Sequence, residues 1–285
     1  MDDLEDTQYR LEKELEELRP IRAFVRMGDG TAAEVPAVMG EATRTDLAPL
    51  REPPAAPQVA THNFRFSEDY DLYPSGAKTK YKNNVMAIKL LKQIELEKRT
   101  ATPEEQIILA RYVGWGGLAN AFSSTASGWE NEYQELKSLL TDVEYKAAMN
   151  STITAYYTEP DLIRHIYRAL ERFGFEGGPD RKILDPGMGT GNFYSVLPEQ
   201  FQGSKLFGVE LDSITGRIAK QLYPDADISI MGYEATKFED NSFDVILGNI
   251  PFNSVKIYDR RYNDLNPYIH DYFFIKSLDL SLIHI

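Results

Sequence analysis

One stretch restricts the fold of this chain more than any other: Lys182–Phe193, which reads KILDPGMGTGNF. Its first residues are apolar and predict the end of a short buried strand, and the Asp-Pro pair that follows stops that strand. Three glycines then allow the backbone to turn tightly and to approach a ligand where a Cβ would obstruct it. A strand, a glycine loop and a helix N-terminus predict a cradle for a nucleoside-type cofactor. The residues expected to contact this cofactor are Asp185, Pro186, Gly187, Gly189, Gly191, Asn192 and Phe193.

The residues around the glycines discriminate between nucleoside cofactors. A dinucleotide fingerprint requires G-x-G-x-x-G, but Tyr194 stands where the third glycine should be. A Walker loop would need Gly-Lys-Ser/Thr, which is absent here. The carboxylate of Asp185 would repel a pyrophosphate but can pair with a cation, and S-adenosylmethionine carries a sulfonium, an ammonium and no phosphate. The loop therefore favours S-adenosylmethionine over NAD, with a plain strand–turn–helix as the alternative.

Composition excludes several classes of function. A hydrophobic content of 42% permits a real core, and a formal charge of −13 argues against a globally basic nucleic-acid binder. The chain has no cysteine and only four scattered histidines, so thiolate metal sites are excluded and no metal is expected. No long apolar run and no signal peptide occur, which predicts a cytoplasmic protein without a membrane partner.

The chain divides into three predicted parts. Residues 1–62 hold an acidic helix and a Pro/Ala-rich linker, and form a disordered leader. Residues 63–150 form a helical accessory domain, with helices expected at Asn83–Lys98, after Thr102 and at Glu130–Met149. Trp115 lies in an exposed-looking loop between these helices, where packing of this domain onto the next one is favoured over stacking on a base.

Residues 151–285 have a different character, because strand and helix signals alternate along them. This pattern predicts a parallel, doubly wound α/β sheet. The expected strands are Lys182–Asp185, Leu206–Leu211, Asp227–Met231 and Phe243–Leu247. The expected helices are Asp161–Phe173, one from Asn192, Ser213–Tyr223 and His270–Asp279.

A second acidic residue extends the cofactor site. Glu210 ends the second predicted strand, 19 residues after Gly191. In doubly wound nucleoside folds an acid at this place accepts hydrogen bonds from the ribose hydroxyls. Glu234 or Tyr233, just past the third strand, is expected to bracket the adenine ring.

The fourth predicted strand runs into Gly248-Asn249-Ile250-Pro251-Phe252, which carries the chemistry. The Asn249 side-chain oxygen and the Ile250 carbonyl can each accept an N–H from an exocyclic amine. The nitrogen lone pair is then less delocalised into the ring and can point at a sulfonium methyl. Phe252 would stack on the flipped ring, and Pro251 would stiffen the loop. Taken alone, N-x-P-F is also compatible with an ordinary turn.

These residues resemble the amino-methyltransferases, in particular the N6-adenine DNA methyltransferases. The resemblance implies a Rossmann-like class I core that binds S-adenosylmethionine at Asp185–Phe193 and at Glu210. It makes Asn249–Phe252 the counterpart of the catalytic N-P-P-Y/F, in which Ile250 replaces the first proline and keeps the carbonyl. Tyr156, Tyr157 and Thr158 resemble the segment that closes over the methionine part of the cofactor in such enzymes.

Several sequence blocks recur in order between residues 63 and 279: ATPEEQIILARYVGWGGL, YYT, GVELDSITGRIAKQLYP, GNIPFN and IHDYFFIKSLD. Together they resemble more specifically the methylase part of large methyltransferase–helicase proteins of conjugative elements and phages, some linked to antirestriction. The resemblance implies a DNA substrate and a helicase portion in the same polypeptide. It also implies a seven-stranded sheet in the order 3-2-1-4-5-7-6, of which four strands are expected here. The core is therefore expected to be truncated after the fourth strand, and Leu280–Ile285 resembles a translated transposon end.

Two alternatives to DNA adenine methylation stay open at this point. Methyltransferases that act on protein glutamine or on RNA share the N-P-P-Y device. A cofactor-binding or DNA-binding module without catalysis, serving a helicase or protecting incoming DNA, is compatible with Ile250.

Overall fold

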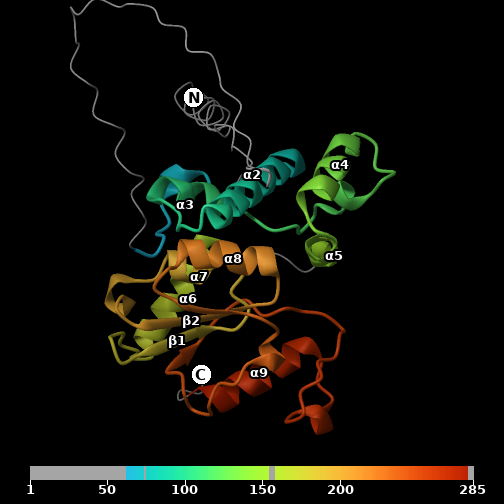
Figure 1. Cartoon of the computed structure of the whole chain (residues 1–285). Coiled ribbons are helices and arrows are strands. Elements are labelled where there is room, and N and C mark those ends of the chain that lie inside the picture. Colours follow the sequence, from blue (N-terminus) through green and yellow to red (C-terminus); the bar gives the residue numbers. More distant parts are fainter. Residues whose placement is uncertain (1–61, 74, 154–157, 282–285) are drawn as a thin grey trace, which may run out of the picture. The chain divides into compact units, whose positions relative to one another are not determined.

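Four parallel strands form a sheet in the order β3-β2-β1-β4 (Figure 1). Their bounds are β1 Lys182–Asp185, β2 Lys205–Glu210, β3 Asp227–Ile230 and β4 Val245–Ile246. The computed structural model describes residues 62–73, 75–153 and 158–281. The predicted parallel α/β sheet is confirmed, and its strand order matches the first four positions of the order that the resemblance implies.

Side chains alternate between the two faces of the sheet, and each face has its own helices. Ile183 faces the larger apolar cluster, which holds α6, α7 and α8, whereas its neighbour Leu184 faces a smaller cluster under α9. Figure 1 shows α9 on one side of the sheet and the other three helices on the opposite side. The bounds are α6 Pro160–Arg172, α7 Asn192–Ser195, α8 Ser213–Leu222 and α9 Ile269–Leu280.

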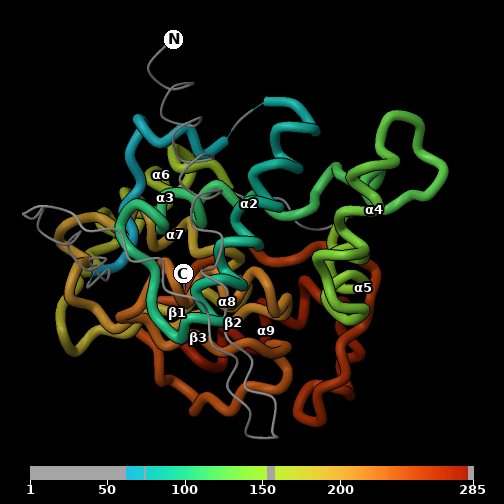
Figure 2. The backbone as a smooth tube through the Cα atoms, turned by 45° about the horizontal axis from the view of Figure 1, so that its top comes forward, coloured from blue at the N-terminus to red at the C-terminus, as the bar shows by residue number. Residues whose placement is uncertain are grey.

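A helical segment packs on the outer side of α8. It consists of α2 Ala77–Leu96, α3 Pro103–Ala110, α4 Glu130–Leu139 and α5 Asp142–Asn150. Both α2 and α3 contact α8, and the tube view in Figure 2 places them over it. The described residues, from 62 to 281 with their gaps, belong to one compact unit. The predicted domain boundary at residue 150 stays a prediction.

The prediction of one helix at Glu130–Met149 is wrong, because the structure has two helices there. Leu140 is in an extended conformation, and Thr141 begins α5 with a capping box. The Thr141 hydroxyl accepts from the Glu144 amide at 3.3 Å, and the Glu144 carboxylate accepts from the Thr141 amide at 2.9 Å. Such reciprocal bonds satisfy amides that a helix start leaves unpaired, so the chain restarts a helix at this point.

Trp115 is buried at 1% exposure, so its loop is not exposed as the sequence suggested. Its ring makes edge contacts with Tyr112 and Phe122. These rings belong to the helical segment itself, so packing of this domain onto the next one through Trp115 stays a prediction. Stacking of Trp115 on a base is contradicted because the ring is enclosed.

The fourth strand is shorter than the predicted Phe243–Leu247, since only Val245 and Ile246 belong to the ladder with β1. Phe243 makes an isolated parallel bridge with Ser281. The Asp244 carboxylate accepts from the Lys182 amide at 2.9 Å and from Arg181 at 2.7 Å. The Lys182 amide at the start of β1 thus donates to a side chain instead of to the backbone of the fourth strand, and the regular ladder begins only at Val245.

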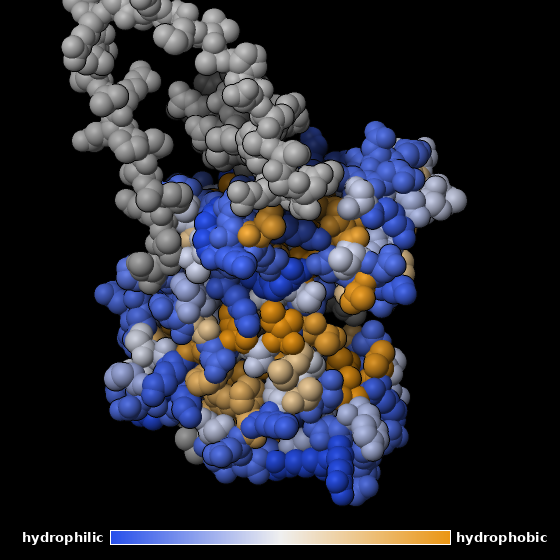
Figure 3. Space-filling view, viewed as in Figure 1, coloured by the Kyte–Doolittle hydropathy of each residue, from blue (hydrophilic) through white to orange (hydrophobic). Residues whose placement is uncertain are grey.

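Apolar side chains gather across the middle of the face shown in Figure 3, and hydrophilic ones dominate above and below. Within the described ranges, no helix is both long and apolar enough to cross a bilayer. The same ranges contain no group of three or more acidic or histidine side chains suited to a metal ion.

Candidate functional site

The strand order reverses between β1 and β4, and ligands of such sheets bind at this reversal. Asp185 ends β1 and is 1% exposed, and a Cβ at Gly248 after β4 would collide with its carboxylate. Glycine at position 248 therefore lets the carboxylate of Asp185 lie against the loop that carries Asn249. The Gly187 amide donates to Asp185 Oδ1 at 3.2 Å.

Burial raises the pKa of Asp185 to about 8, although the Gly187 amide lowers it and nearby Glu210 raises it further. A carboxylate that is deprived of water in this way is stabilised by any cation that binds beside it. Asp185 is thus suited to a positively charged ligand and opposes a phosphate, as the sequence predicts.

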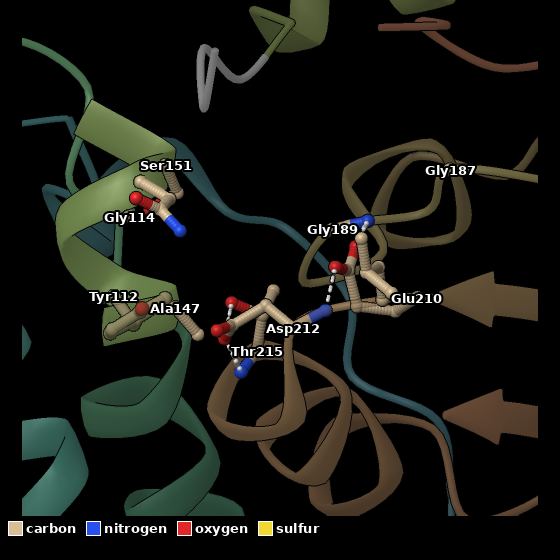
Figure 4. Close-up of a pocket in the computed structure, with 11 residues that line it drawn as sticks. Tyr112, Gly114, Ala147, Ser151, Gly187, Gly189, Glu210, Asp212 and Thr215 are labelled. Atoms are coloured by element: carbon tan, nitrogen blue, oxygen red, sulfur yellow. Dashed lines mark hydrogen bonds between the residues drawn. The ribbon is translucent and has the colours of Figure 1, made fainter. Parts of the chain in front are cut away.

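Glu210 at the end of β2 is held by the loop it faces. Its two oxygens accept from the amides of Gly189 at 2.9 Å and Asp212 at 2.7 Å (Figure 4). Burial raises the pKa of Glu210 to about 7, while these amides lower it. A carboxylate oxygen has a second lone pair, so each oxygen can still accept from a ligand hydroxyl.

Three cavities adjoin one another along this edge of the sheet. The first, of about 430 Å³, reaches from the glycine loop to Glu210 and Asp212. The second, of about 40 Å³, lies between the glycine loop and Asn249, and shares Gly187 and Gly189 with the first. The third, of about 410 Å³, shares Asn249 and Thr158 with the second. A ligand that extends from the first cavity through the second would therefore reach Asn249, which also lines the third.

Gly191 shows why the loop needs glycine. Its φ is +86°, and a Cβ there would collide with the ring of Tyr223. We expect Gly191→Ala to lower the free energy of unfolding by about 2–4 kcal/mol, because left-handed strain adds to overpacking. The control is Gly203→Ala, since Gly203 has a φ of +87° and open space around it. We expect it to cost about 1 kcal/mol in the same urea titration; equal losses would contradict the role of Tyr223.

Tyr194, which occupies the place of the third dinucleotide glycine, has a structural role that sequence reasoning missed. Its hydroxyl accepts from the Asp185 amide at 3.1 Å and donates to the Phe207 carbonyl. One buried side chain thus joins the end of β1, at Asp185, to the middle of β2.

The proposed catalytic residues lie next to the glycine loop, with one exception. A Cβ at Gly187 would lie 3.8 Å from the Asn249 carbonyl oxygen and 3.9 Å from Pro251 Cδ. Ile250 packs against the apolar cluster under α9. Phe252 does not line the three cavities; it is 69% exposed and stacks on His270, with ring centroids 5.7 Å apart.

The other predicted cofactor residues differ in their placement. Tyr156 and Tyr157 lie outside the described residues, as does the acidic helix predicted before residue 20. The Thr158 carbonyl accepts from Asn192 Nδ2 at 3.2 Å, which links it to the glycine loop. Glu234 is exposed and does not line the three cavities. Tyr233 is buried under α9 instead of bracketing the first cavity.

Several residues that line the cavities were not anticipated. Those of the first cavity are Tyr112, Gly114, Ala147, Asn150, Ser151, Leu211, Asp212 and Thr215. Those of the third cavity are Glu159, Leu162 and Ile166. Asp212 and Thr215 carried a signal, because D-S-I-T after a strand is typical of a helix cap, and Asp212 Oδ1 accepts from the Thr215 amide at 2.8 Å. The residues of the helical segment carried none.

Comparison with protein families matches residues 184–261 to a model described as "Methyltransferase domain". "Defense against restriction protein B" of Escherichia phage P1 is 27% identical over 203 residues, which are 69% of this chain and 7% of that protein. "Modification methylase CviBIII" of Paramecium bursaria Chlorella virus NC1A is 32% identical over 78 residues, or 27% of this chain and 21% of that protein. The chain thus spans a small part of the length of both relatives.

Solved structures similar to the chain include a TehB-like SAM-dependent methyltransferase from Corynebacterium glutamicum. It is 25% identical, covers 32% of this chain and 54% of its own, and has a TM-score of 0.22. A geranyl diphosphate C-methyltransferase from Streptomyces coelicolor is 16% identical, with coverages of 73% and 64% and a TM-score of 0.32.

Proposed function

We propose that this chain, which carries a class I S-adenosylmethionine-dependent methyltransferase domain, methylates the N6 amine of adenine in DNA. The observation that carries the proposal is the adjacency of the cofactor loop and the Asn249 loop at the reversal of the strand order. The proposed function is that of the methylase part of a larger mobile-element protein with a helicase portion.

The residues of the site fit S-adenosylmethionine. Asp185 is a buried carboxylate beside the glycine loop, suited to the ammonium and sulfonium of the cofactor. Glu210 faces a cavity of about 430 Å³ and keeps lone pairs for the ribose hydroxyls. When bound, the cofactor supplies an electrophilic methyl group.

The residues around Asn249 are proposed to prepare the accepting amine. The Asn249 side-chain oxygen and the Ile250 carbonyl oxygen each accept a hydrogen bond from one N–H group of this amine. These bonds reduce delocalisation of the nitrogen lone pair into the ring. Pro251 limits the freedom of this loop, so the acceptors are in place before the substrate arrives. Packing of Ile250 under α9 fixes the residue that replaces the family's first proline. The reaction needs no covalent intermediate on the protein and no metal.

An aromatic stack behind Phe252 favours a planar substrate. Phe252 stacks on His270, and His270 stacks on Tyr268 with centroids 5.9 Å apart and an interplanar angle of 13°. Lys256 Nζ lies 5.0 Å from the centroid of the Tyr268 ring and covers the far end of the stack. The exposed end is therefore Phe252, three residues after Asn249. Stacking on this ring would contribute binding free energy for a nucleobase, whereas a glutamine side chain, which has no ring, would obtain little.

DNA is favoured over RNA by the two relatives, whose names refer to defence against restriction and to a modification methylase. The phage relative also supports a second candidate, in which the domain binds cofactor or DNA in antirestriction without catalysis. Methylation of protein glutamine remains the third candidate.

The test is transfer of tritiated methyl from S-adenosylmethionine to unmethylated DNA, total RNA and protein extract, with nucleoside mass spectrometry of the products. We expect the label in DNA, where it is recovered as N6-methyl-2′-deoxyadenosine. Label in RNA or protein alone would replace the DNA proposal by an alternative. Cofactor binding without label in any acceptor would favour the non-catalytic module.

A further inference from the structure

The first cavity has two walls that come from different parts of the chain. Its inner wall consists of the glycine loop and the residues that follow β2. Its outer wall consists of Tyr112, Gly114, Ala147, Asn150 and Ser151, all from the helical segment. In Figure 4 the labelled residues of this outer wall lie across an open space from Glu210 and Asp212. A nucleoside held by Glu210 would thus have the end of α5 on its other side.

The turn that carries Gly114 is held in place from inside the helical segment. Asn84 of α2 is fully buried, and its Nδ2 donates to the Gly114 carbonyl at 2.6 Å. Asn84 Oδ1 accepts from the Val113 amide at 2.9 Å. A buried amide that makes both bonds fixes the backbone of this turn, so this part of the outer wall is prepared before any ligand binds.

An ion-pair cluster joins the two walls about one helical turn from the cavity. Arg217 of α8 pairs with Glu144 of α5, and also with Glu95 of α2 at 2.8 Å. Lys92 reaches the second oxygen of Glu144 at 3.0 Å. Arg217 lies two residues after Thr215, and Glu144 three residues before Ala147, and both of these neighbours line the cavity. The pair therefore ties α5 to α8 close to residues that line the cavity.

We propose that the helical segment forms the outer half of the cofactor site, with Asn150 and Ser151 contacting the nucleoside part of S-adenosylmethionine. Arg217 is a positioning residue that holds this wall through Glu144. Cofactor affinity and the docking of α5 on α8 are then coupled, and each strengthens the other. The proposal rests on S-adenosylmethionine as the cofactor and is independent of which amine is methylated.

The experiment is calorimetric titration of the whole chain and two variants with S-adenosylmethionine and with 5′-methylthioadenosine, which lacks the amino-acid part. We expect Arg217→Met to weaken the binding of both ligands by about 10-fold or more. A loss of affinity of this size is typical when the coupling between two parts of a site is removed. We expect Asn150→Ala to weaken both by about 3–10-fold, the value of one hydrogen bond. Equal losses for the two ligands would place the contact on the nucleoside.

The matched control is Arg261→Met. Arg261 also bridges two acids, Asp240 at 2.5 Å and Asp279 at 2.8 Å, but it lies away from the cavity lining. We expect the affinity of the Arg261→Met variant for both ligands to equal that of the unchanged chain. If Arg217→Met unfolds, the exposed Asn150 decides the question, because truncation at this helix end leaves the core intact. Folded Asn150→Ala with unchanged affinity for both ligands would overturn the proposal. Failure of methyl transfer alone would overturn only the proposed function.

Discussion

Replacing Asn249 by alanine is expected to lower kcat for methyl transfer by about 10²–10³, the usual effect of removing one preorganised polar contact to a reacting group. Asn249 lines both the small cavity beside the glycine loop and the larger one next to it. Its amide oxygen is the proposed acceptor for one N–H of the amine. The cofactor affinity should stay within about twofold, because the contacts proposed for the cofactor lie on Asp185 and Glu210.

Asn253→Ala is the matched control for this variant. It removes the same amide from the same loop, four residues further along the chain. Single-turnover rates and calorimetric cofactor affinities should be measured for both variants. An Asn249→Ala chain that transfers methyl groups as fast as Asn253→Ala would exclude Asn249 from the chemistry.

Replacing Asp185 by asparagine is expected to stabilise the cofactor-free protein at high pH and to weaken cofactor binding. Asparagine keeps the shape and the acceptor for the Gly187 amide but removes a buried charge. Burial holds the pKa of Asp185 at about 8 in the folded chain, against 3.8 for the free side chain. We expect a gain in unfolding free energy of about 2 kcal/mol or more at pH 8.5.

The direction of the pH dependence follows from proton binding. Between pH 4 and pH 8 the folded chain holds the Asp185 proton and the unfolded chain does not, so stability falls as the pH rises through this window. Well above pH 8 both states have lost the proton, and the Asp185 contribution becomes constant. The difference in stability between the unchanged chain and Asp185→Asn should therefore grow from pH 5 to pH 8.5.

Cofactor binding should show the opposite pH dependence. A cationic ligand needs the carboxylate, so the affinity of the unchanged chain should rise between pH 6 and pH 8.5, while that of Asp185→Asn stays low. Urea titrations and calorimetry at four pH values measure both effects. A variant whose affinity and stability follow those of the unchanged chain at every pH would show that the Asp185 charge has no role.

The centre of the fold could be predicted because its signals are local. The glycine loop, the apolar strand ends and the Asn249 loop each lie within a few neighbouring residues, and a parallel sheet brings strand ends together. The boundaries of β1 agree with the prediction, and those of α8 differ by one residue. The two-helix break at Leu140–Thr141 was missed although T-D-V-E is a capping-box sequence, because the apolar pattern continues across it.

The outer wall of the first cavity could not be predicted in the same way. Asn150 and Gly114 face Glu210 across the first cavity because α3 packs on α8 and Arg217 ties α5 to α8. Contacts between residues so far apart in the sequence leave no local pattern. Tyr194 looked like a departure from a dinucleotide loop. Its role in joining β1 to β2 depends on where the Phe207 carbonyl lies in the folded sheet.

The most direct measurement is calorimetric titration of this chain with S-adenosylmethionine at pH 8, beside Asp185→Asn and Asn249→Ala. We expect one site in the unchanged chain, a similar affinity in Asn249→Ala and a loss of at least about 10-fold in Asp185→Asn. That result would place the cofactor at the glycine loop and leave Asn249 for the amine. A folded chain that binds no S-adenosylmethionine, or binds it equally well without the Asp185 charge, would contradict the assignment of the site.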